Sequence, residues 1–187
     1  MSQIEIIFIR HGEAANRWGD HPDPGLSDKG KMQSNNLLKH KELQHLEKYS
    51  FLSSPKLRAI ETAKPLAKKF NKEVMLDDTF IEIPSDNIKA NEKQKWLEDI
   101  IKCKNNDLPN FVKSWRKNIF DKTKSFNGNV VIFSHFMVIN ALVSELAKID
   151  RLLYFYPDYT SVVKIVMKDL KFDYFTLEGN KKTSINL

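Results

Sequence analysis

The chain has little of several features that would assign it to a special class of protein. Cys103 is the only cysteine among 187 residues, which excludes an internal disulfide framework and suits a reducing compartment. No apolar run approaches the roughly 20 residues needed to span a bilayer. The first five residues lack the basic and apolar pattern of a secretory leader. We therefore expect a cytoplasmic protein without a membrane partner.

A block of basic residues is also missing, although the formal net charge is +6. The lysines are spread along the chain, as on the solvated faces of helices. No motif typical of nucleic-acid-binding proteins accompanies them. The charge therefore predicts weak attraction of anions and no nucleic-acid partner, and it leaves the oligomeric state open.

What is present is the composition of a folded domain, with 41% hydrophobic and 29% charged residues. A chain of this length suits one domain, residues 1–187. Short apolar runs alternate with helical patterns, which predicts an α/β fold with a mostly parallel central sheet. Strands are expected at 4–9, 49–53, 73–76, 130–133, 161–167 and 172–177. Helices are expected at about 27–46, with Ser27 as its cap, and at 55–70 and 138–147.

The segment from residue 87 to residue 126 departs from this alternation. Its large apolar side chains recur at helical spacing, and Pro109 divides them between two helices. We expect residues 87–126 to form a small helical cap inserted into the domain.

Arg10-His11-Gly12-Glu13 directly follows the first predicted strand. Ligands of open α/β sheets bind beyond the carboxyl ends of the strands. Glycine at position 12 allows a ligand to approach the backbone. An arginine beside a histidine offers a planar set of donors next to an imidazole nucleophile. These residues predict a phosphate site.

Arg58 lies in the first turn of the helix that follows the second predicted strand. A cation is poorly placed there, because the N-terminus is the positive end of the helix macrodipole. We therefore expect an anion nearby, and a phosphate held by Arg58 is favoured over a plain surface cation.

Two further strand ends carry groups that suit phosphate chemistry. His135 follows the strand at 130–133 and starts a helix, where free N–H groups gather into an anion site. Glu82 lies between apolar residues after the third strand, where partial burial would keep its carboxyl protonated as an acid. Each residue alone also has a structural interpretation.

Together these motifs resemble the histidine phosphatase superfamily, also called phosphoglycerate-mutase-like. Residues 10–13 are similar to its RHG signature, residues 26–33 to its L-[ST]-x-x-G-x-x-Q helix start, residues 54–63 to its S-P-x-x-R-A-x-x-T-A helix, and residues 134–135 to its second histidine. The resemblance covers nearly the whole chain and implies a three-layer α/β/α fold. It also implies two sets of site residues: catalytic His11, Glu82 and His135, and phosphate-binding Arg10, Arg58 and His135.

Two positions depart from the family pattern. The family often has an asparagine six residues after the first histidine, where this chain has Arg17 preceded by Asn16. We expect the phosphate contact to come from Asn16 or Arg17. Two glycines often follow the second histidine, where this chain has Phe136 and Met137. These side chains either narrow the pocket with apolar groups or belong to the core.

The resemblance implies a metal-independent phosphomonoester hydrolase that needs no cofactor. His11 would attack phosphorus and form a phosphohistidine, and Glu82 would protonate the leaving oxygen of a phosphorylated small molecule. The run at 20–23, Asp-His-Pro-Asp, is interpreted as a loop rather than a metal site, because of its proline.

Three alternatives stay open. They are phosphoryl transfer of the phosphoglycerate mutase type, a phosphohistidine protein phosphatase, and a non-catalytic module that binds a phospho-ligand or nucleic acid. The short chain favours hydrolysis, since mutases of the family usually enclose the site with longer segments.

Overall fold

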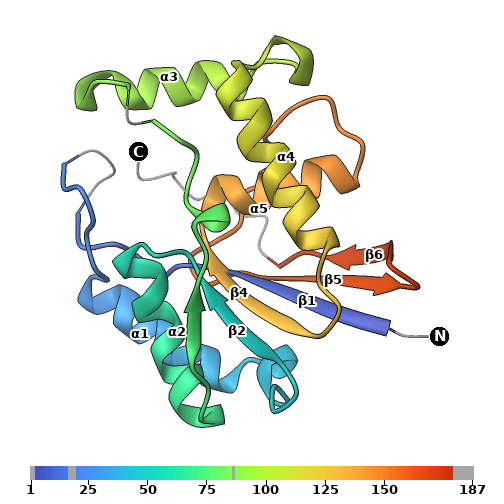
Figure 1. Ribbon diagram of the computed structural model, residues 1–187. Helices are drawn as coiled ribbons and strands as arrows, with labels where there is room; N and C mark the ends of the chain where they lie inside the picture. Colours follow the sequence, from blue (N-terminus) through green and yellow to red (C-terminus); the bar gives the residue numbers. More distant parts are fainter. Residues whose placement is uncertain (1–2, 17–19, 86, 179–187) are drawn as a thin grey trace.

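The computed structural model describes residues 3–16, 20–85 and 87–178. Its strands are β1 (Gln3–Arg10), β2 (Ser50–Ser53), β3 (Val74–Leu76), β4 (Val130–Ser134), β5 (Val162–Lys168) and β6 (Lys171–Thr176). They form one sheet in the order β3-β2-β4-β1-β5-β6 (Figure 1). The first four strands in that order are parallel, and β5 and β6 continue the sheet as an antiparallel pair. The expected α/β fold with a mostly parallel sheet is confirmed.

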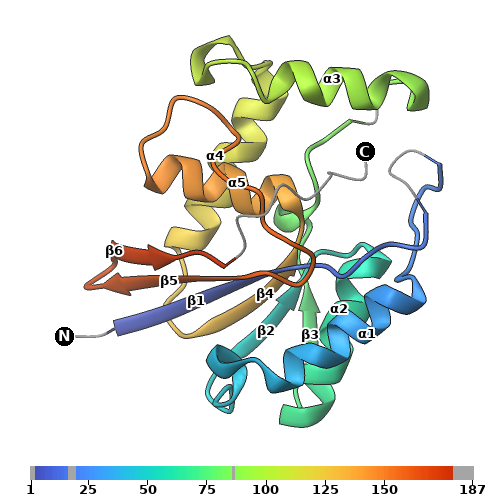
Figure 2. The same cartoon turned by 180° about the vertical axis from the view of Figure 1, so that it is seen from behind.

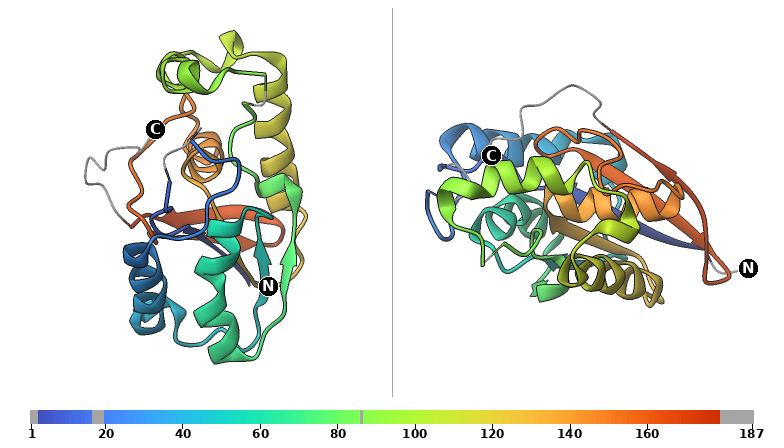
Figure 3. Two further views of the ribbon diagram at one scale, coloured as in Figure 1. Left: turned by 90° about the vertical axis from the view of Figure 1, so that its left-hand side faces the viewer. Right: turned by 90° about the horizontal axis from the view of Figure 1, so that it is seen from above.

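Helices cover both faces of this sheet (Figures 1 and 2). One face carries α1 (Asp28–Asn36) and α2 (Leu57–Phe70), and the other carries α4 (Asn110–Lys124) and α5 (Phe136–Leu146). The remaining helix, α3 (Lys93–Ile100), lies on the outer side of α5, away from the sheet (Figure 3). Short 3₁₀ helices lie at Leu37–Lys39, Lys41–Leu43, Asp78–Phe80, Ala90–Glu92 and Asn105–Asp107. No helix in the described part of the chain is long and apolar enough to cross a lipid bilayer.

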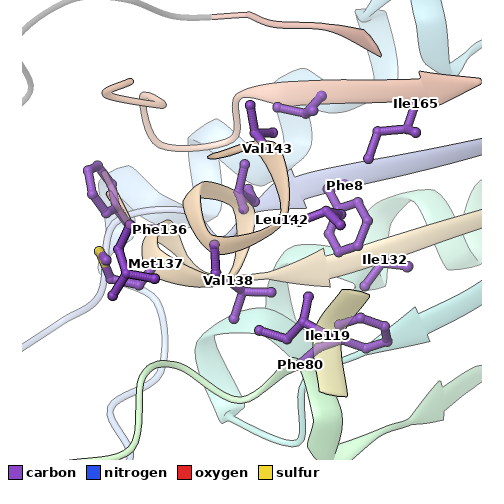
Figure 4. Close-up of a cluster of buried hydrophobic side chains, with 14 of the residues drawn as sticks. Phe8, Phe80, Ile119, Ile132, Phe136, Met137, Val138, Leu142, Val143 and Ile165 are labelled. Carbon is purple, nitrogen blue, oxygen red and sulfur yellow. The ribbon is translucent and has the colours of Figure 1, made fainter. Parts of the chain in front are cut away.

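The two covered faces explain why β1 is apolar along its length. Ile6 and Phe8 pack into one core, with α4 and α5, whereas Ile7 and Ile9 pack into the other, with α2. Successive side chains of a strand point to opposite faces, so a strand covered on both sides needs apolar residues at consecutive positions. Figure 4 shows the first of these cores, between the sheet and α5.

The helix expected over residues 27–46 is shorter than predicted. Ser27 does cap α1, accepting a backbone hydrogen bond at 3.0 Å, but the helix ends at Asn36. Asparagine is a weak helix former, and the extended backbone of His40 separates two 3₁₀ turns. This path buries both Leu37 and Leu43. A continuous helix would place positions six apart on different faces.

Two helices occupy residues 87–126, and Pro109 directly precedes α4. Val112 and Ile119 of α4 are fully buried, and Leu97 and Ile100 of α3 belong to the same core. The segment therefore completes one layer of the fold and also extends beyond it through α3.

The parallel strands end at one edge of the sheet. Arg10, the last residue of β1, pairs with Ser134, the last residue of β4. Ser53 ends β2 beside Phe133 of β4. The residues that follow these strands therefore emerge close together, although they are far apart in sequence.

Candidate active site

Two histidines lie side by side because their strands are neighbours. His11 follows β1, and its amide donates to the carbonyl of Ser134 at 2.9 Å. His135 follows β4 as the residue before α5. The two imidazole rings meet edge to face, with centroids 5.1 Å apart. Strand pairing thus brings two distant motifs into one site.

The loop after β1 is fixed against α1 by close contact between two glycines. A Cβ on Gly12 would lie 2.7 Å from the carbonyl oxygen of Gly30, and a Cβ on Gly30 would lie 2.1 Å from that of Glu13. The Glu13 amide donates to Gln33 at 2.8 Å, and the Ser27 hydroxyl donates to the Glu13 carboxylate at 2.9 Å. The motif at 26–33 therefore holds the loop in place.

The hydrogen bonds of His11 define its tautomer. Nδ1 lies 2.7 Å from the Gly12 carbonyl oxygen, which only accepts, so Nδ1 carries the hydrogen. Nε2 accepts a hydrogen bond from Nε of Arg58 at 3.2 Å. Burial lowers the pKa of His11 well below its ordinary value, and the charges of Arg58 and Arg10 lower it further. His11 is therefore a neutral imidazole with a lone pair on Nε2.

Arg58 is buried near the start of α2. The hydroxyl of Thr62 accepts from the Gly12 amide at 3.0 Å and donates to the Arg58 carbonyl at 2.7 Å, which joins α2 to the loop after β1. One carboxylate also lies near the Arg58 guanidinium. The carboxylate of Asp23 accepts from the Leu57 amide at 3.0 Å and lies 4.0 Å from Nη1 of Arg58.

His135 is fully buried. Its Nε2 lies 2.8 Å from the hydroxyl oxygen of Ser54, and Nδ1 has no hydrogen-bond partner among the described residues. Burial lowers the pKa of His135 well below its ordinary value, with further lowering from Arg58 and His11. The imidazole is neutral in this arrangement.

Glu82 lies two residues after the 3₁₀ helix Asp78–Phe80, with its side chain partly buried. Its carboxylate accepts hydrogen bonds from the Ile83 amide at 2.9 Å and the Met137 amide at 3.2 Å. Burial raises the pKa of Glu82, although both amides and the charges of Arg58 and Arg10 oppose that shift. The Met137 amide, in the first turn of α5, thus holds the Glu82 carboxylate in place.

A cavity of about 670 Å³ lies at this site. Five of the predicted site residues line it: Arg10, His11, Asn16, Arg58 and Glu82. His135 contacts His11 from the buried side. Arg17 lies outside the described residues. Lys56 and Lys93 also line the cavity, which adds positive charge to its walls.

Phe136 and Met137 fill both of the roles that the sequence left open, in the core and at the pocket. Each is at most 2% exposed and belongs to the core on the α5 side of the sheet. Both also line the cavity. Figure 4 shows them at the end of that core, beyond Val138. They therefore supply an apolar wall to the site.

Both the sequence and the fold are similar to those of known proteins. Residues 6–178 match the histidine phosphatase superfamily (branch 1). The chain belongs to this superfamily. It is 26% identical to phosphoserine phosphatase 1 of Hydrogenobacter thermophilus, over 79% of this chain and 78% of that protein. The family and this relative support phosphatase activity.

Solved structures of other proteins share the fold of this superfamily member. Bacillus stearothermophilus YhfR superposes with a TM-score of 0.74 at 20% identity, covering 98% of this chain and 100% of that chain. A phosphoserine phosphatase from Entamoeba histolytica, in complex with 3-phosphoglyceric acid, superposes with a TM-score of 0.72 at 21% identity, with the same coverage. The expected phosphoglycerate-mutase-like fold is confirmed.

Three residues that contact the site were not predicted from the sequence. Ser54 and Thr62 lie inside the motif at 54–63, so a signal for them was available. Tyr159 packs on Arg10, with its ring centroid 4.2 Å from Cζ. No local pattern connects Tyr159 with β1, because only the fold brings the two segments together.

In the described part of the chain, no group of three or more His, Cys, Asp or Glu side chains is placed to hold a metal ion. Within the run at 20–23, Nδ1 of His21 accepts a hydrogen bond from the Asp23 amide at 3.1 Å. This contact belongs to a turn of the loop that precedes α1.

Proposed function

We propose that this protein is a metal-independent phosphomonoester hydrolase that works through a phosphohistidine on His11. The observation that carries the proposal is the state of His11. Its Nδ1 is occupied by the Gly12 carbonyl, and its Nε2 lone pair lies at a cavity beside two guanidinium groups. A neutral imidazole of fixed tautomer is a competent nucleophile toward phosphorus.

In the first step, Nε2 of His11 bonds to phosphorus while the bond from phosphorus to the ester oxygen breaks. The electron pair leaves with that oxygen, and the carboxyl of Glu82 protonates it. In the second step, water attacks phosphorus and gives a proton to the Glu82 carboxylate. The bond from phosphorus to His11 breaks, which releases inorganic phosphate and restores both residues.

Arg10 and Arg58 face the negative charge on the phosphoryl oxygens in this proposal. A phosphomonoester carries a charge of about −1.5 to −2 at neutral pH, so two guanidinium groups match it closely. We assign His135 to the same phosphoryl group, whose charge favours the protonated form of this imidazole. Asn16 lines the cavity and is proposed to complete the phosphate contacts. Arg17, which lies outside the described residues, is the alternative donor that the sequence offers.

We propose residues 87–126 as a helical cap within a single domain of residues 1–187. Lys93 and Leu97 of α3 line the cavity, so this segment helps to select the substrate. We propose that the substrate is a phosphorylated small molecule. Phosphoserine is the first compound to test, because a relative and a structural neighbour carry the name phosphoserine phosphatase.

Isotope labelling tests the proposal. Wild-type protein mixed with a ³²P-labelled substrate and quenched within milliseconds is expected to carry label that is labile in acid and stable in base. His11→Ala is expected to carry none. His45→Ala, which replaces an exposed histidine away from the cavity, is the matched control and is expected to label normally. Label that persists on His11→Ala would remove His11 from this role.

A further inference from the structure

The guanidinium of Arg10 contacts two aromatic rings and a carbonyl oxygen. Its Cζ lies 4.2 Å from the ring centroid of Tyr159 and 5.1 Å from that of Phe136. Nη1 donates to the carbonyl of Pro157 at 2.7 Å. Arg10 is only 3% exposed, and attraction between a cation and an aromatic face is strongest when both are shielded from water. We call Phe136, Pro157 and Tyr159 the Arg10 clamp.

The backbone beside Tyr159 is fastened to the strand that carries Arg10. The Thr160 amide donates to the Arg10 carbonyl at 3.1 Å, and the Arg10 amide donates to the Ser161 carbonyl at 3.1 Å. The Ser161 amide donates to the Asp158 carbonyl at 3.0 Å, which closes a turn around Tyr159. The ring of Tyr159 and the guanidinium of Arg10 therefore share one rigid frame.

Asn140 is fully buried in α5. It connects the start of α5, which carries Phe136, with the chain that leads to Pro157. Its Nδ2 donates to the Phe136 carbonyl at 3.0 Å. Its Oδ1 accepts from the amides of Tyr154 and Phe155 at 2.8 and 3.0 Å. These two residues lead directly into the segment that contains Pro157, so one side chain ties the start of that segment to the first turn of α5, which carries Phe136.

Thr160 has an unusual backbone conformation, with φ at 60°. A β-branched residue is strained in this left-handed region. Such conformations persist where surrounding contacts enforce them, and they cluster at functional sites. Here the hydrogen bond from the Thr160 amide to the Arg10 carbonyl enforces the conformation of Thr160. The turn places Tyr159 against the guanidinium.

We propose that the Arg10 clamp positions Arg10 for the phosphoryl group, and that Tyr159 is a positioning residue of the proposed phosphatase reaction, on which this inference rests. The rings cover the guanidinium, Nη1 donates to the Pro157 carbonyl, and the remaining N–H groups at the edge of the guanidinium are left to bind the anion. Phe136 takes part in the clamp at a position where the family often has glycine. In this chain Arg10 is therefore held by a side chain that a glycine would not supply.

Binding of inorganic phosphate to the full chain, measured by titration calorimetry, tests the clamp. Tyr159→Leu is expected to weaken phosphate binding about tenfold, because it removes a ring face from a desolvated guanidinium. Tyr159→Phe keeps the ring and is expected to recover most of that loss. Unchanged binding in Tyr159→Leu would overturn the proposal, and so would equal losses in the two variants.

A double-mutant cycle tests whether Tyr159 acts through Arg10. In an Arg10→Ala background, Tyr159→Leu is expected to cause no further loss of phosphate binding. A loss as large as in the wild-type background would overturn the proposal. Tyr174→Leu, which replaces a half-exposed tyrosine on β6, is the matched control and is expected to bind phosphate normally.

Phe136→Leu provides a second test that does not depend on the folding of Tyr159→Leu. This variant is also expected to weaken phosphate binding, and thermal unfolding shows whether each variant is folded. Unchanged phosphate binding in a folded Phe136→Leu protein would overturn the clamp. Phosphate binding needs no turnover. Wild-type protein that binds phosphate but hydrolyses no phosphomonoester would therefore overturn the proposed function and leave the clamp standing.

Discussion

Nε of Arg58 donates a hydrogen bond of 3.2 Å to Nε2 of His11, the atom that would attack phosphorus. Before substrate binds, this contact occupies the lone pair of the nucleophile. An incoming phosphoryl group offers oxygen acceptors to Arg58 and phosphorus to His11. In the proposed reaction, the guanidinium that now bonds the neutral imidazole would exchange this contact for the anion that the imidazole attacks.

Arg58→Met is expected to lower kcat/KM by about 10²–10³-fold, the usual scale for loss of one donor to a developing anion. It is also expected to raise the pKa of His11, because Arg58 disfavours a second positive charge nearby. In a profile of kcat/KM against pH, the acid limb therefore moves to higher pH. Lys68→Ala, which removes an exposed cation from the same helix, leaves that limb in place. An acid limb at the same pH in wild type and Arg58→Met would argue against an effect of Arg58 on the pKa of His11.

Glu82→Gln is expected to slow esters with poor leaving groups far more than p-nitrophenyl phosphate, because only the former need a proton from the acid. The pKa of Glu82 is raised by burial, so wild-type activity on poor leaving groups declines as pH rises through that pKa. The variant lacks this alkaline limb. Glu73→Gln, at an exposed site beside β3, is the control. Equal losses on both classes of ester would show that Glu82 is not the acid.

Gly30→Ala is expected to reduce the free energy of unfolding by about 1–3 kcal/mol, the cost of overpacking a close contact. The new Cβ would lie 2.1 Å from the Glu13 carbonyl oxygen. This loss runs against helix propensity, which favours alanine over glycine by about 1 kcal/mol. Gly128→Ala is the matched control, since a Cβ there meets nothing within 4 Å. Urea unfolding of both variants measures the difference, and similar stabilities would contradict the packing argument.

Stability is expected to fall as pH decreases below about 6.5, the ordinary pKa of histidine. The folded-state pKa values of His11 and His135 are both depressed by burial. The unfolded chain therefore takes up protons that the folded chain does not, at up to about 1.4 kcal/mol per pH unit for each group. Glu82 has the opposite sign: its raised pKa costs stability as pH rises above the ordinary value of a glutamate.

The pH dependence of urea unfolding between pH 7.5 and 5.5 measures these contributions. His135→Gln is expected to flatten the wild-type slope, because it removes one of the two buried imidazoles. His45→Gln, at an exposed position, is expected to keep the slope. A steeper slope in His135→Gln would contradict a depressed pKa of His135 in the folded chain.

The strands and the strand-end residues were predictable because their signals are local. The run through β1 and the run through β4 are apolar at consecutive positions, as strands buried on both faces must be. Parallel pairing then places the residues that follow at one edge. For this reason the sequence could predict that Arg10, His11 and Arg58 belong to one site.

The end of α1 and the state of His135 could not be predicted in the same way. α1 stops at Asn36 because the buried positions beyond it do not share one helical face, and that depends on the core they must reach. The sequence allowed His135 to be protonated. Its complete burial beside His11 and Arg58 lowers its pKa and makes it neutral in this structure.

The amino-acid sequence alone determined the alternation of elements and the motifs at the strand ends, since periodicity and chain order are local properties. The tertiary structure decided which distant groups touch. The ring of Tyr159 on Arg10, and the Glu82 carboxylate on the amide of Met137, join segments that no local pattern connects. Contacts of this kind depend on packing, and packing fixes the tautomers, charges and orientations that the chemistry requires.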